Sequence, residues 1–192
     1  PTTELYSLGL DNLVIELNSV KLKFGLLSFF QINTPVFEVA LKDVKQFLDK
    51  TKDVVDYYSG VGSIALSLHE HFKNAILIES NNEAVKYAKE NIILNNIKNC
   101  EARLSPTEKM LDLISSDKII IFDPPRAGLD KSVINRIVDV LPERIIYLSC
   151  NLSTQARDIK LLEDKYEVVF LKLYNFFPRT PHVEALCVLE LK

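Results

Sequence analysis

The sequence is poor in cysteine and has no long apolar segment. Its three cysteines, Cys100, Cys150 and Cys187, lie at wide and unpatterned spacing, which fits neither a disulfide framework nor a zinc site made of C-x-x-C pairs. No apolar run approaches the ~18 residues that span a bilayer, and runs such as "IIIF" and "VVFL" have the length of a strand. We therefore expect a protein of the reducing cytoplasm, with no membrane role and no metal site.

An excess of positive charge is also missing. The net charge of -3 and the pI near 5.7 give no basic footprint for nucleic acid and indicate no particular protein partner. Any indication of RNA binding must therefore come from the residues of a site. The chain begins at Pro1, and no charged and apolar leader follows it, so we expect neither a signal peptide nor a natural start, but a piece of a longer protein.

The 192 residues, 47% of them hydrophobic, can bury the core of one large domain with an appendage. From Asp53 onward, short β-branched runs alternate with segments of helical spacing. Seven runs are candidate strands: "DVVDYY", "AILIES", "CEARL", "KIIIFD", "RIIYLS", "YEVVFLKL" and "EALCVLEL". The helical segments between the first five predict the βαβ order of a mostly parallel, doubly wound sheet.

The last two runs interrupt this order. The stretch between them, "YNFFPRTPHV", holds two prolines and no helical pattern, so we expect an antiparallel hairpin at one edge of the sheet. The predicted fold class is α/β, with a seven-stranded, mostly parallel sheet and one antiparallel edge strand. This pattern is similar to the Rossmann-like fold of S-adenosylmethionine-dependent methyltransferases, whereas a dinucleotide-binding fold would keep its strands parallel.

Two further elements precede the predicted sheet. Residues 4–30 are expected to form short β-strands, and we assign residues 1–30 to the end of a preceding β-rich domain and residues 31–192 to the α/β domain. A helix is predicted from Thr34 to Lys50, with Thr34 as its cap and Pro35 at its first position.

The stretch "DYYSGVGSIAL" joins the first of these strands to a helix. Gly60 and Gly62 leave room for a ligand at the turn, and with Ala65 they fit G-x-G-x-x-A. Glu79 follows at the end of the second strand, where a carboxylate can accept from ribose hydroxyls. The alternative is a tight turn and a surface acid. The motif fits a nicotinamide cofactor as well as S-adenosylmethionine, and the reversed strand favours the latter.

Two more strands end in chemically useful residues. Asp123 in "FDPPRAGL" should face the crevice at the carboxyl ends of the strands, unless it only caps a helix or a turn. Arg126 stands where enzymes that methylate exocyclic amines carry an aromatic residue, which disfavours that reaction. Cys150 ends the fifth strand before a helix that Ser153 or Thr154 could cap. Nearby helix N–H groups would favour its thiolate, although a lone cysteine here is more often a packing residue.

Weaker candidates lie near both ends of this domain. His182 or Glu184, before the last strand, could act as a general base if the loop folds over the crevice. Gln31 in "SFFQIN" is either a ligand contact or part of a turn.

Six stretches together resemble a known family. "SFFQIN", "DYYSGVGSIAL", "ES" at positions 79–80, "FDPPRAGL", "LSCNLSTQARD" and "RTPHVEALCVLE" occur in the order found in the RNA uracil-5-methyltransferases of tRNA and rRNA. The resemblance covers about residues 22–192. It implies methyl transfer from S-adenosyl-L-methionine to C5 of a uridine in RNA. The resemblance implies the following roles: cofactor contacts at Gln31, Tyr58, Ser63, Glu79 and Asp123 with Gly60 in the turn, a nucleophile at Cys150 and a base at Glu184.

The sequence departs from the family pattern at several positions. Ser59 replaces a cysteine in the turn, Leu152 replaces the proline after S-C-N, and Arg179 replaces a common histidine. The acid often found near the end of the third strand is also missing from "EARLSPTE". Two alternatives stay open: an RNA cytosine-5-methyltransferase, which often carries a second cysteine that "DPPRAGL" lacks, and a cofactor- or RNA-binding module without catalysis. The sequence does not assign the RNA as tRNA or rRNA.

Overall fold

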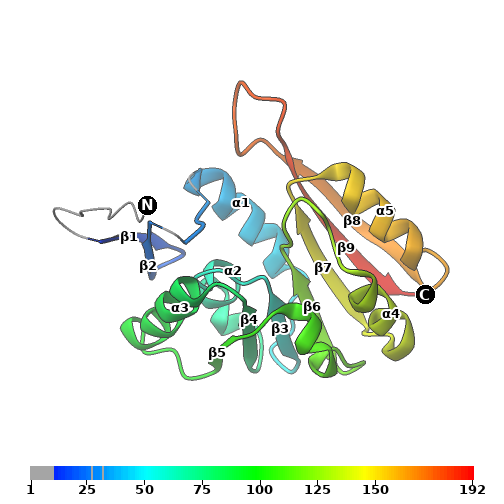
Figure 1. Cartoon of the computed structure of the whole chain (residues 1–192), viewed down its shortest axis with the longest axis horizontal. Coiled ribbons are helices and arrows are strands. Elements are labelled where there is room, and N and C mark those ends of the chain that lie inside the picture. Colours follow the sequence, from blue (N-terminus) through cyan, green and yellow to red (C-terminus); the bar gives the residue numbers. More distant parts are fainter. Residues whose placement is uncertain (1–10, 27, 32) are drawn as a thin grey trace, which may run out of the picture.

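The structure is a computed structural model of the chain and describes residues 11–26, 28–31 and 33–192 (Figure 1). A two-stranded antiparallel hairpin, β1 (Asn12–Leu17) and β2 (Val20–Gly25), precedes a seven-stranded sheet flanked by helices. The strands of that sheet are β3 (Asp53–Tyr57), β4 (Ala75–Glu79), β5 (Cys100–Leu104), β6 (Lys118–Phe122), β7 (Arg144–Ser149), β8 (Tyr166–Tyr174) and β9 (Glu184–Leu191). The α-helices are α1 (Thr34–Lys45), α2 (Ser63–Ser67), α3 (Asn82–Leu94), α4 (Lys131–Val140) and α5 (Leu152–Leu162), with short 3-10 turns at His69–His71, Thr107–Lys109 and Leu111–Leu113.

The order of the strands confirms the predicted fold class. The sheet runs β5-β4-β3-β6-β7-β9-β8, and the first five strands of that order are parallel to one another. The predicted antiparallel hairpin at one edge is formed by β8 and β9. β9 pairs antiparallel with both β7 and β8, so it runs against the other six strands and lies between its two neighbours. In the described part of the chain, no helix is long and apolar enough to cross a membrane.

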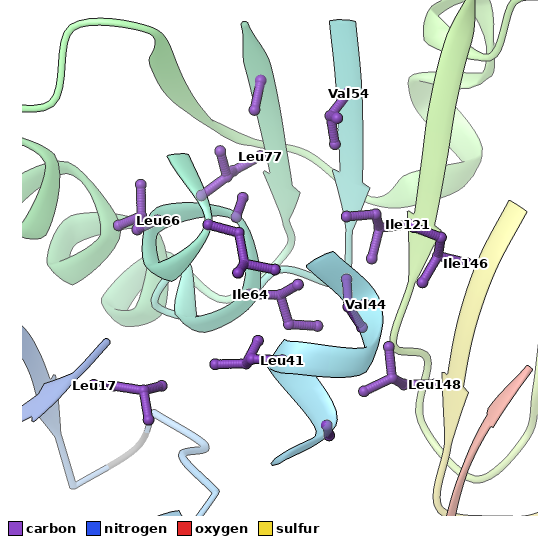
Figure 2. Close-up of a cluster of buried hydrophobic side chains, with 14 of the residues drawn as sticks. Leu17, Leu41, Val44, Val54, Ile64, Leu66, Leu77, Ile121, Ile146 and Leu148 are labelled. Carbon is purple, nitrogen blue, oxygen red and sulfur yellow. The ribbon is translucent and has the colours of Figure 1, made fainter. Parts of the chain in front are cut away.

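The central strands are mostly apolar because helices cover both faces of the sheet. On β6, Ile119 and Ile121 belong to the core on one face, whereas Ile120 and Phe122 belong to the core on the other. Figure 2 shows the first of these cores, in which α1 packs across the sheet. This packing fixes the ends of the central strands, where the predicted site residues lie.

Helix α1 is shorter than predicted and begins differently. Thr34 is its first residue, and Asn33 occupies the capping position. The helix ends at Lys45 and not at Lys50, because the following amides bond to carbonyls three residues back, which tightens the last turn. The apolar pattern continues past the end because Phe47 packs against Phe170 of β8, with ring centroids 5.3 Å apart.

The hairpin packs against the α/β part of the chain. Leu17, Val20 and Leu22 are buried in the same core as α1, and Figure 2 shows Leu17 facing this cluster. The predicted strands within residues 4–10 lie outside the described residues. The division of the chain between residues 30 and 31 stays a prediction.

Candidate active site

The sheet brings the predicted site residues to one edge. Parallel strands present their carboxyl ends together, and because β9 is reversed, its first residue, Glu184, lies at this same edge beside the end of β7. A cavity of about 410 Å³ opens there. Its wall is formed by Phe29, Gln31, Tyr58, Gly60, Glu79, Ser80, Asp123, Pro124, Pro125, Arg126, Cys150 and Glu184.

Of the residues that the family resemblance assigns to the site, all but Ser63 line this cavity. Ser63 is the first residue of α2, directly after the glycine-rich turn. His182, the other candidate base, is exposed and does not line the cavity; its Nδ1 lies 3.5 Å from Arg126 Nη2. The structure therefore favours Glu184 over His182 as the group that faces a bound substrate. The individual roles stay predictions.

The turn between β3 and α2 has an unusual backbone. Tyr58, Gly60 and Gly62 have positive φ angles of 60°, 55° and 87°, in the left-handed region where side chains are strained. A Cβ at Gly60 would lie no closer than 3.9 Å to a neighbour, whereas one at Gly62 would lie 2.7 Å from Leu66 Cδ1. We expected both glycines to make room for a ligand. Only Gly60 faces the cavity, and Gly62 makes room for the core beneath the turn.

Glu79 ties the end of β4 to this turn. Its Oε2 accepts from Gly60 N over 3.0 Å, and its Oε1 accepts from Asn81 N over 2.7 Å. Backbone amides thus fix the carboxylate at the cavity wall. Since a carboxylate has about four acceptor sites, Glu79 can also accept from a ligand hydroxyl.

Asp56 is a buried acid under the turn that the sequence analysis did not single out. Its side chain is fully buried; Oδ2 accepts from Ala65 N over 3.3 Å, and Oδ1 has no hydrogen-bond partner among the described residues. Burial, and then the charges of Asp123 and Glu79, raise the pKa of Asp56 to about 8. The acid is therefore mostly protonated at neutral pH. The sequence pattern that could have indicated this buried acid is an aspartate inside the apolar run "DVVDYY".

Gln31 carries an unused acceptor at the cavity. Its side chain is only 5% exposed, and its Oε1 has no hydrogen-bond partner in the described part of the chain. Buried acceptors are normally satisfied. An orphaned oxygen on a cavity wall is therefore suited to a ligand that brings a donor.

Three ionisable groups in the cavity influence one another. Burial, and then the charge of Glu184, raise the pKa of Asp123 to about 7. Burial also raises the pKa of Glu184, which is 4% exposed, and Arg126 opposes that rise. Burial, and then Glu184 and Asp123, raise the pKa of Cys150, with Arg126 again acting in the opposite direction.

The expectation that helix amides would favour the Cys150 thiolate is therefore wrong for the free protein. Desolvation and two carboxyl groups outweigh them. The cap of α5 also differs from the prediction, because Asn151 Oδ1 accepts from Ser153 N over 3.1 Å, so neither Ser153 nor Thr154 caps the helix. This bond uses one of the helix amides that we expected to act on the thiol.

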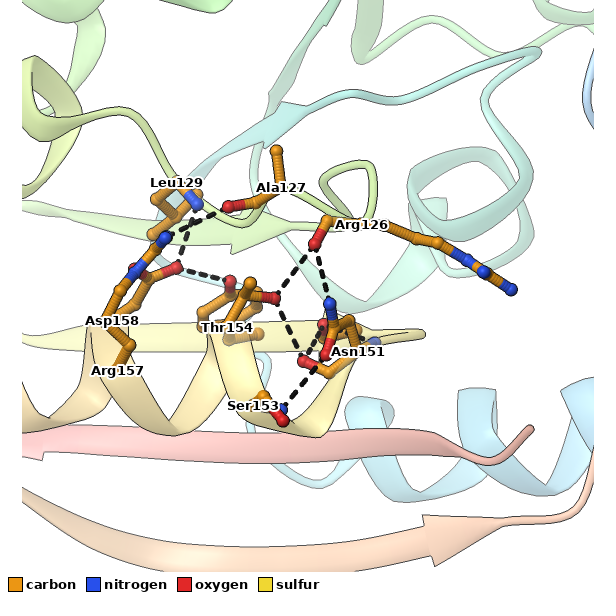
Figure 3. Close-up of polar contacts among 10 residues, drawn as sticks. Arg126, Ala127, Leu129, Asn151, Ser153, Thr154, Arg157 and Asp158 are labelled. Carbon is orange, nitrogen blue, oxygen red and sulfur yellow. Dashed lines mark hydrogen bonds and ion pairs between the residues drawn. The ribbon is translucent and has the colours of Figure 1, made fainter. Parts of the chain in front are cut away.

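The loop after β6 is held in place by α5 (Figure 3). Asn151 Nδ2 and Thr154 Oγ1 donate to the carbonyl oxygen of Arg126 over 2.9 and 3.1 Å. Further along the helix, the buried carboxylate of Asp158 accepts from Leu129 N over 2.8 Å. The segment that follows the predicted nucleophile thus fixes the backbone that carries Arg126.

The other two cysteines lie outside the cavity. Cys187 is buried on β9, and Cys100 is the half-buried first residue of β5. Burial raises the pKa of each thiol to about 12. In the described cavity wall, Cys150 is the only thiol.

Comparison with known proteins identifies relatives of this chain. A family model described as "tRNA (Uracil-5-)-methyltransferase" matches residues 10–192. An uncharacterized RNA methyltransferase of Mycoplasma mobile is 34% identical over 91% of this chain and 48% of its own length. One of Nanoarchaeum equitans is 41% identical over 85% of this chain and 36% of its own length. The chain thus spans less than half of these curated relatives.

Solved structures agree with this relationship. The tRNA (uracil-54, C5)-methyltransferase of Pyrococcus abyssi, in complex with S-adenosyl-L-homocysteine, has a TM-score of 0.85 and 31% identity, and the match covers 95% of this chain and 45% of that one. The M. jannaschii tRNA m1G37 methyltransferase, at 18% identity, a TM-score of 0.73 and coverage of 95% of this chain and 57% of that one, shows a shared fold alone. The resemblance of the sequence motifs is confirmed, and the chain belongs to the tRNA (uracil-5-)-methyltransferase family.

Proposed function

We propose that this chain transfers a methyl group from S-adenosyl-L-methionine to C5 of a uridine in RNA. The observation that carries the proposal is the meeting of a thiol, a buried carboxyl and a glycine-rich turn in one cavity, at Cys150, Glu184 and Gly60. Membership of the family and the 31% identical structure bound to S-adenosyl-L-homocysteine support it. Residues 31–192 would form the catalytic domain, in the cytoplasm, and residues 1–30 the end of a preceding one.

The cavity fits the cofactor. Glu79 would accept from the ribose hydroxyls, Gln31 Oε1 is an acceptor in need of a donor, and Gly60 lets the ligand approach the backbone. Tyr58 and Asp123 form the wall between the turn and the predicted nucleophile. Ser63 remains part of the proposed set, although it does not line the cavity. When bound, the cofactor supplies an electrophilic methyl group.

The protein's own residues would make C5 of uracil reactive. C5 is a poor nucleophile, so the Cys150 thiolate adds first at C6; a C–S bond forms, and the electrons of the C5–C6 double bond move to the C4 oxygen. C5 of the resulting enolate would take the methyl group, and the bond between that methyl and the sulfonium sulfur would break, which leaves S-adenosyl-L-homocysteine. Glu184 then takes the C5 proton, the double bond re-forms, and the C–S bond breaks to release the thiolate.

The electrostatics of the cavity suit this sequence of events. A carboxyl whose pKa is raised by burial is a better proton acceptor near neutral pH than an exposed one, which fits the role of Glu184. The thiol of Cys150 is mostly neutral in the free protein. The positive charge of a bound sulfonium would favour its ionisation, because opposite charges nearby stabilise a thiolate.

The RNA must present a single, unstacked base. Both faces of the uracil ring are needed, so the target uridine should be flipped out or lie in a loop. We propose RNA as the macromolecular partner, either tRNA or rRNA. The mild net negative charge of this chain predicts weak general affinity for RNA phosphates.

The test uses the full-length protein, S-adenosyl-L-methionine, and candidate tRNA and rRNA transcripts that carry 5-fluorouridine. Fluorine at C5 cannot leave as a proton, so the methylated adduct is trapped and migrates as a covalent protein–RNA band. Cys150→Ala should abolish the band. Glu184→Gln should still form an adduct on normal RNA but turn over slowly. Absence of any adduct from protein that methylates the same unsubstituted RNA would refute the covalent mechanism.

The two alternatives predict other outcomes. A cytosine-5-methyltransferase would be trapped by 5-fluorocytidine and not by 5-fluorouridine; the presence of one thiol in the described cavity wall favours the uracil enzyme. A binding module without catalysis would bind the cofactor or RNA but give no methylated product with either base.

A further inference from the structure

Asn91 connects three parts of the molecule through one buried side chain. It lies on α3 and is fully buried. Its Oδ1 accepts from Lys23 N of β2 over 2.7 Å, and its Nδ2 donates to Lys23 O over 3.0 Å and to Val61 O over 3.1 Å. Val61 lies between the two glycines of the cofactor turn. The hairpin, the helix and the turn therefore meet at this amide.

Asn95, one helical turn later, provides a natural comparison. Its Oδ1 accepts from Lys21 N over 2.8 Å and its Nδ2 donates to Lys21 O over 2.7 Å. Both asparagines thus bond to β2 as a neighbouring strand would. The remaining bond distinguishes them, because Asn95 Nδ2 donates to Asn91 O, within its own helix, over 2.8 Å. Only Asn91 reaches the turn.

The bond to Val61 fixes the part of the turn that is easiest to rotate. Gly60 and Gly62 flank Val61, and glycine restricts neighbouring peptide planes least of all residues. Holding the Val61 carbonyl orients the peptide that it shares with Gly62, whose N–H donates to Ser59 O over 2.8 Å. On the other side of Val61, Gly60 N donates to Glu79 at the cavity wall. Asn91 thus holds the turn at Val61, on the side that faces the core, while Gly60 of the same turn lines the cavity.

We propose that Asn91 is a positioning residue, which preorganises the glycine-rich turn for the cofactor. The inference rests on the assignment of this cavity to S-adenosyl-L-methionine but not on the target base. A turn that is already ordered binds with less loss of conformational entropy. Without Asn91, the Val61 carbonyl would be buried without a partner or the peptide would rotate, and binding would have to restore the order.

The experiment compares Asn91→Ala with Asn95→Ala in the full-length protein. The dissociation constant of S-adenosyl-L-homocysteine is measured by calorimetry, well below the melting temperature of either variant. Both variants should melt earlier than the parent, because both lose bonds to β2. The dissociation constant should rise roughly tenfold in Asn91→Ala, because leaving about one buried polar group without a partner costs that much free energy. In Asn95→Ala it should stay within about twofold of the parent value. Hydrogen exchange of residues 59–63 should speed up only in Asn91→Ala.

Each other outcome overturns the proposal. Equal losses of affinity in the two variants would mean that Asn91 acts only through stability, and unchanged affinity in Asn91→Ala would mean that the turn needs no support. If the parent protein does not bind S-adenosyl-L-homocysteine, the cofactor assignment itself fails, and the inference fails with it. Should Asn91→Ala not fold, Asn91→Ser carries the same expectation, because its hydroxyl is too short to join Lys23 to Val61.

Discussion

The side-chain amide of Asn151 donates to the carbonyl oxygen of Arg126 over 2.9 Å. This bond joins the residue after the predicted nucleophile to the residue after the two prolines of "DPPR". The other atom of the same amide, Oδ1, caps α5 through Ser153 N. Together with Thr154, which donates to the same carbonyl, Asn151 therefore fixes the backbone of Arg126 relative to Cys150.

Asn151→Asp separates these two tasks. The variant keeps an acceptor for the cap but places an oxygen against the Arg126 carbonyl. We expect a free energy of unfolding within about 1 kcal/mol of the parent and a fall in kcat of tenfold or more, since small displacements of reacting groups are costly. Asp130→Asn is the matched control, because Asp130 caps α4 through Ser132 N and does not line the cavity. Parental kcat in Asn151→Asp would show that this bond does not matter for catalysis.

The reactivity of Cys150 should depend on pH in a defined direction. Its pKa lies above the ordinary 9.0 because of burial, Glu184 and Asp123. The neutral thiol therefore dominates near pH 7, and alkylation by iodoacetamide in the cofactor-free protein should still accelerate as the pH rises past about 9. Glu184→Gln should lower the pH midpoint of Cys150 alkylation, because it removes a negative charge. Arg126→Gln should raise that midpoint, because it removes a positive charge.

Peptide mass spectrometry identifies which thiol has reacted. Cys100 and Cys187 serve as internal controls, because burial raises the pKa of each to about 12 and they should react far more slowly. A midpoint for Cys150 below its ordinary value would contradict the electrostatic description of the cavity.

Asp56 should make the protein less stable as the pH rises. Its folded pKa, about 8, lies above its ordinary value of 3.8. The folded state therefore holds a proton that the unfolded state releases, and stability is lost between these two values as the pH increases. Asp56→Asn removes the ionisation. The free energy of unfolding of the variant should therefore exceed that of the parent by at least about 1 kcal/mol at pH 8, and this difference should disappear near pH 4.

Urea unfolding across this pH range tests the prediction. Asp123 and Glu184 also have raised pKa values. The free energy of unfolding of Asp56→Asn should therefore depend less on pH than that of the parent, but some dependence should remain. Asp53→Asn, at the half-buried start of the same strand, is the matched control for the loss of a carboxyl from β3. An unchanged slope in Asp56→Asn would mean that Asp56 is ionised at neutral pH.

Leu152→Pro should stabilise α5. Leu152 is the first residue of the helix, after a capping Asn151 with extended φ and ψ of −135° and 100°. Proline is favoured at this position because its missing N–H has no partner within the helix, and an extended residue before it avoids a clash. We expect the free energy of unfolding to rise by about 0.4–1 kcal/mol, because proline restricts the conformations of the unfolded chain. The change is measured as a higher Tm. A lower Tm would show that the backbone at Leu152 is not free to accept proline.

The sequence predicted the strands and the location of the site because both follow from local patterns. Buried parallel strands are short apolar runs; "KIIIFD" ends at Asp123 and "RIIYLS" is followed by Cys150, and both of these residues line the cavity. The prolines of "YNFFPRTPHV" marked the edge hairpin. The gathering of Asp123, Cys150 and Glu184 at one cavity then follows from the direction of three strands.

Other features depend on contacts that no local pattern records. The caps at Asn33 and Asn151 differ from the predicted Thr34 and Ser153 or Thr154 by a few residues, since several polar residues in a row can cap equally well. The raised pKa of Cys150 comes from burial and then from Glu184, which lies on another strand. The role proposed for Asn91 requires Lys23, 68 residues earlier in the chain.

The reversal of β9 has a consequence for the order in which the protein is assembled. β8 is made before β9, yet in the described sheet it pairs only with β9. β8 therefore cannot join the sheet before β9 has paired with β7, and such non-local pairing is slow. A folding intermediate with only the five parallel strands would already present Glu79 and Asp123 but not Glu184. The pairing of β9 with β7 thus also brings the second member of the proposed catalytic pair to Cys150.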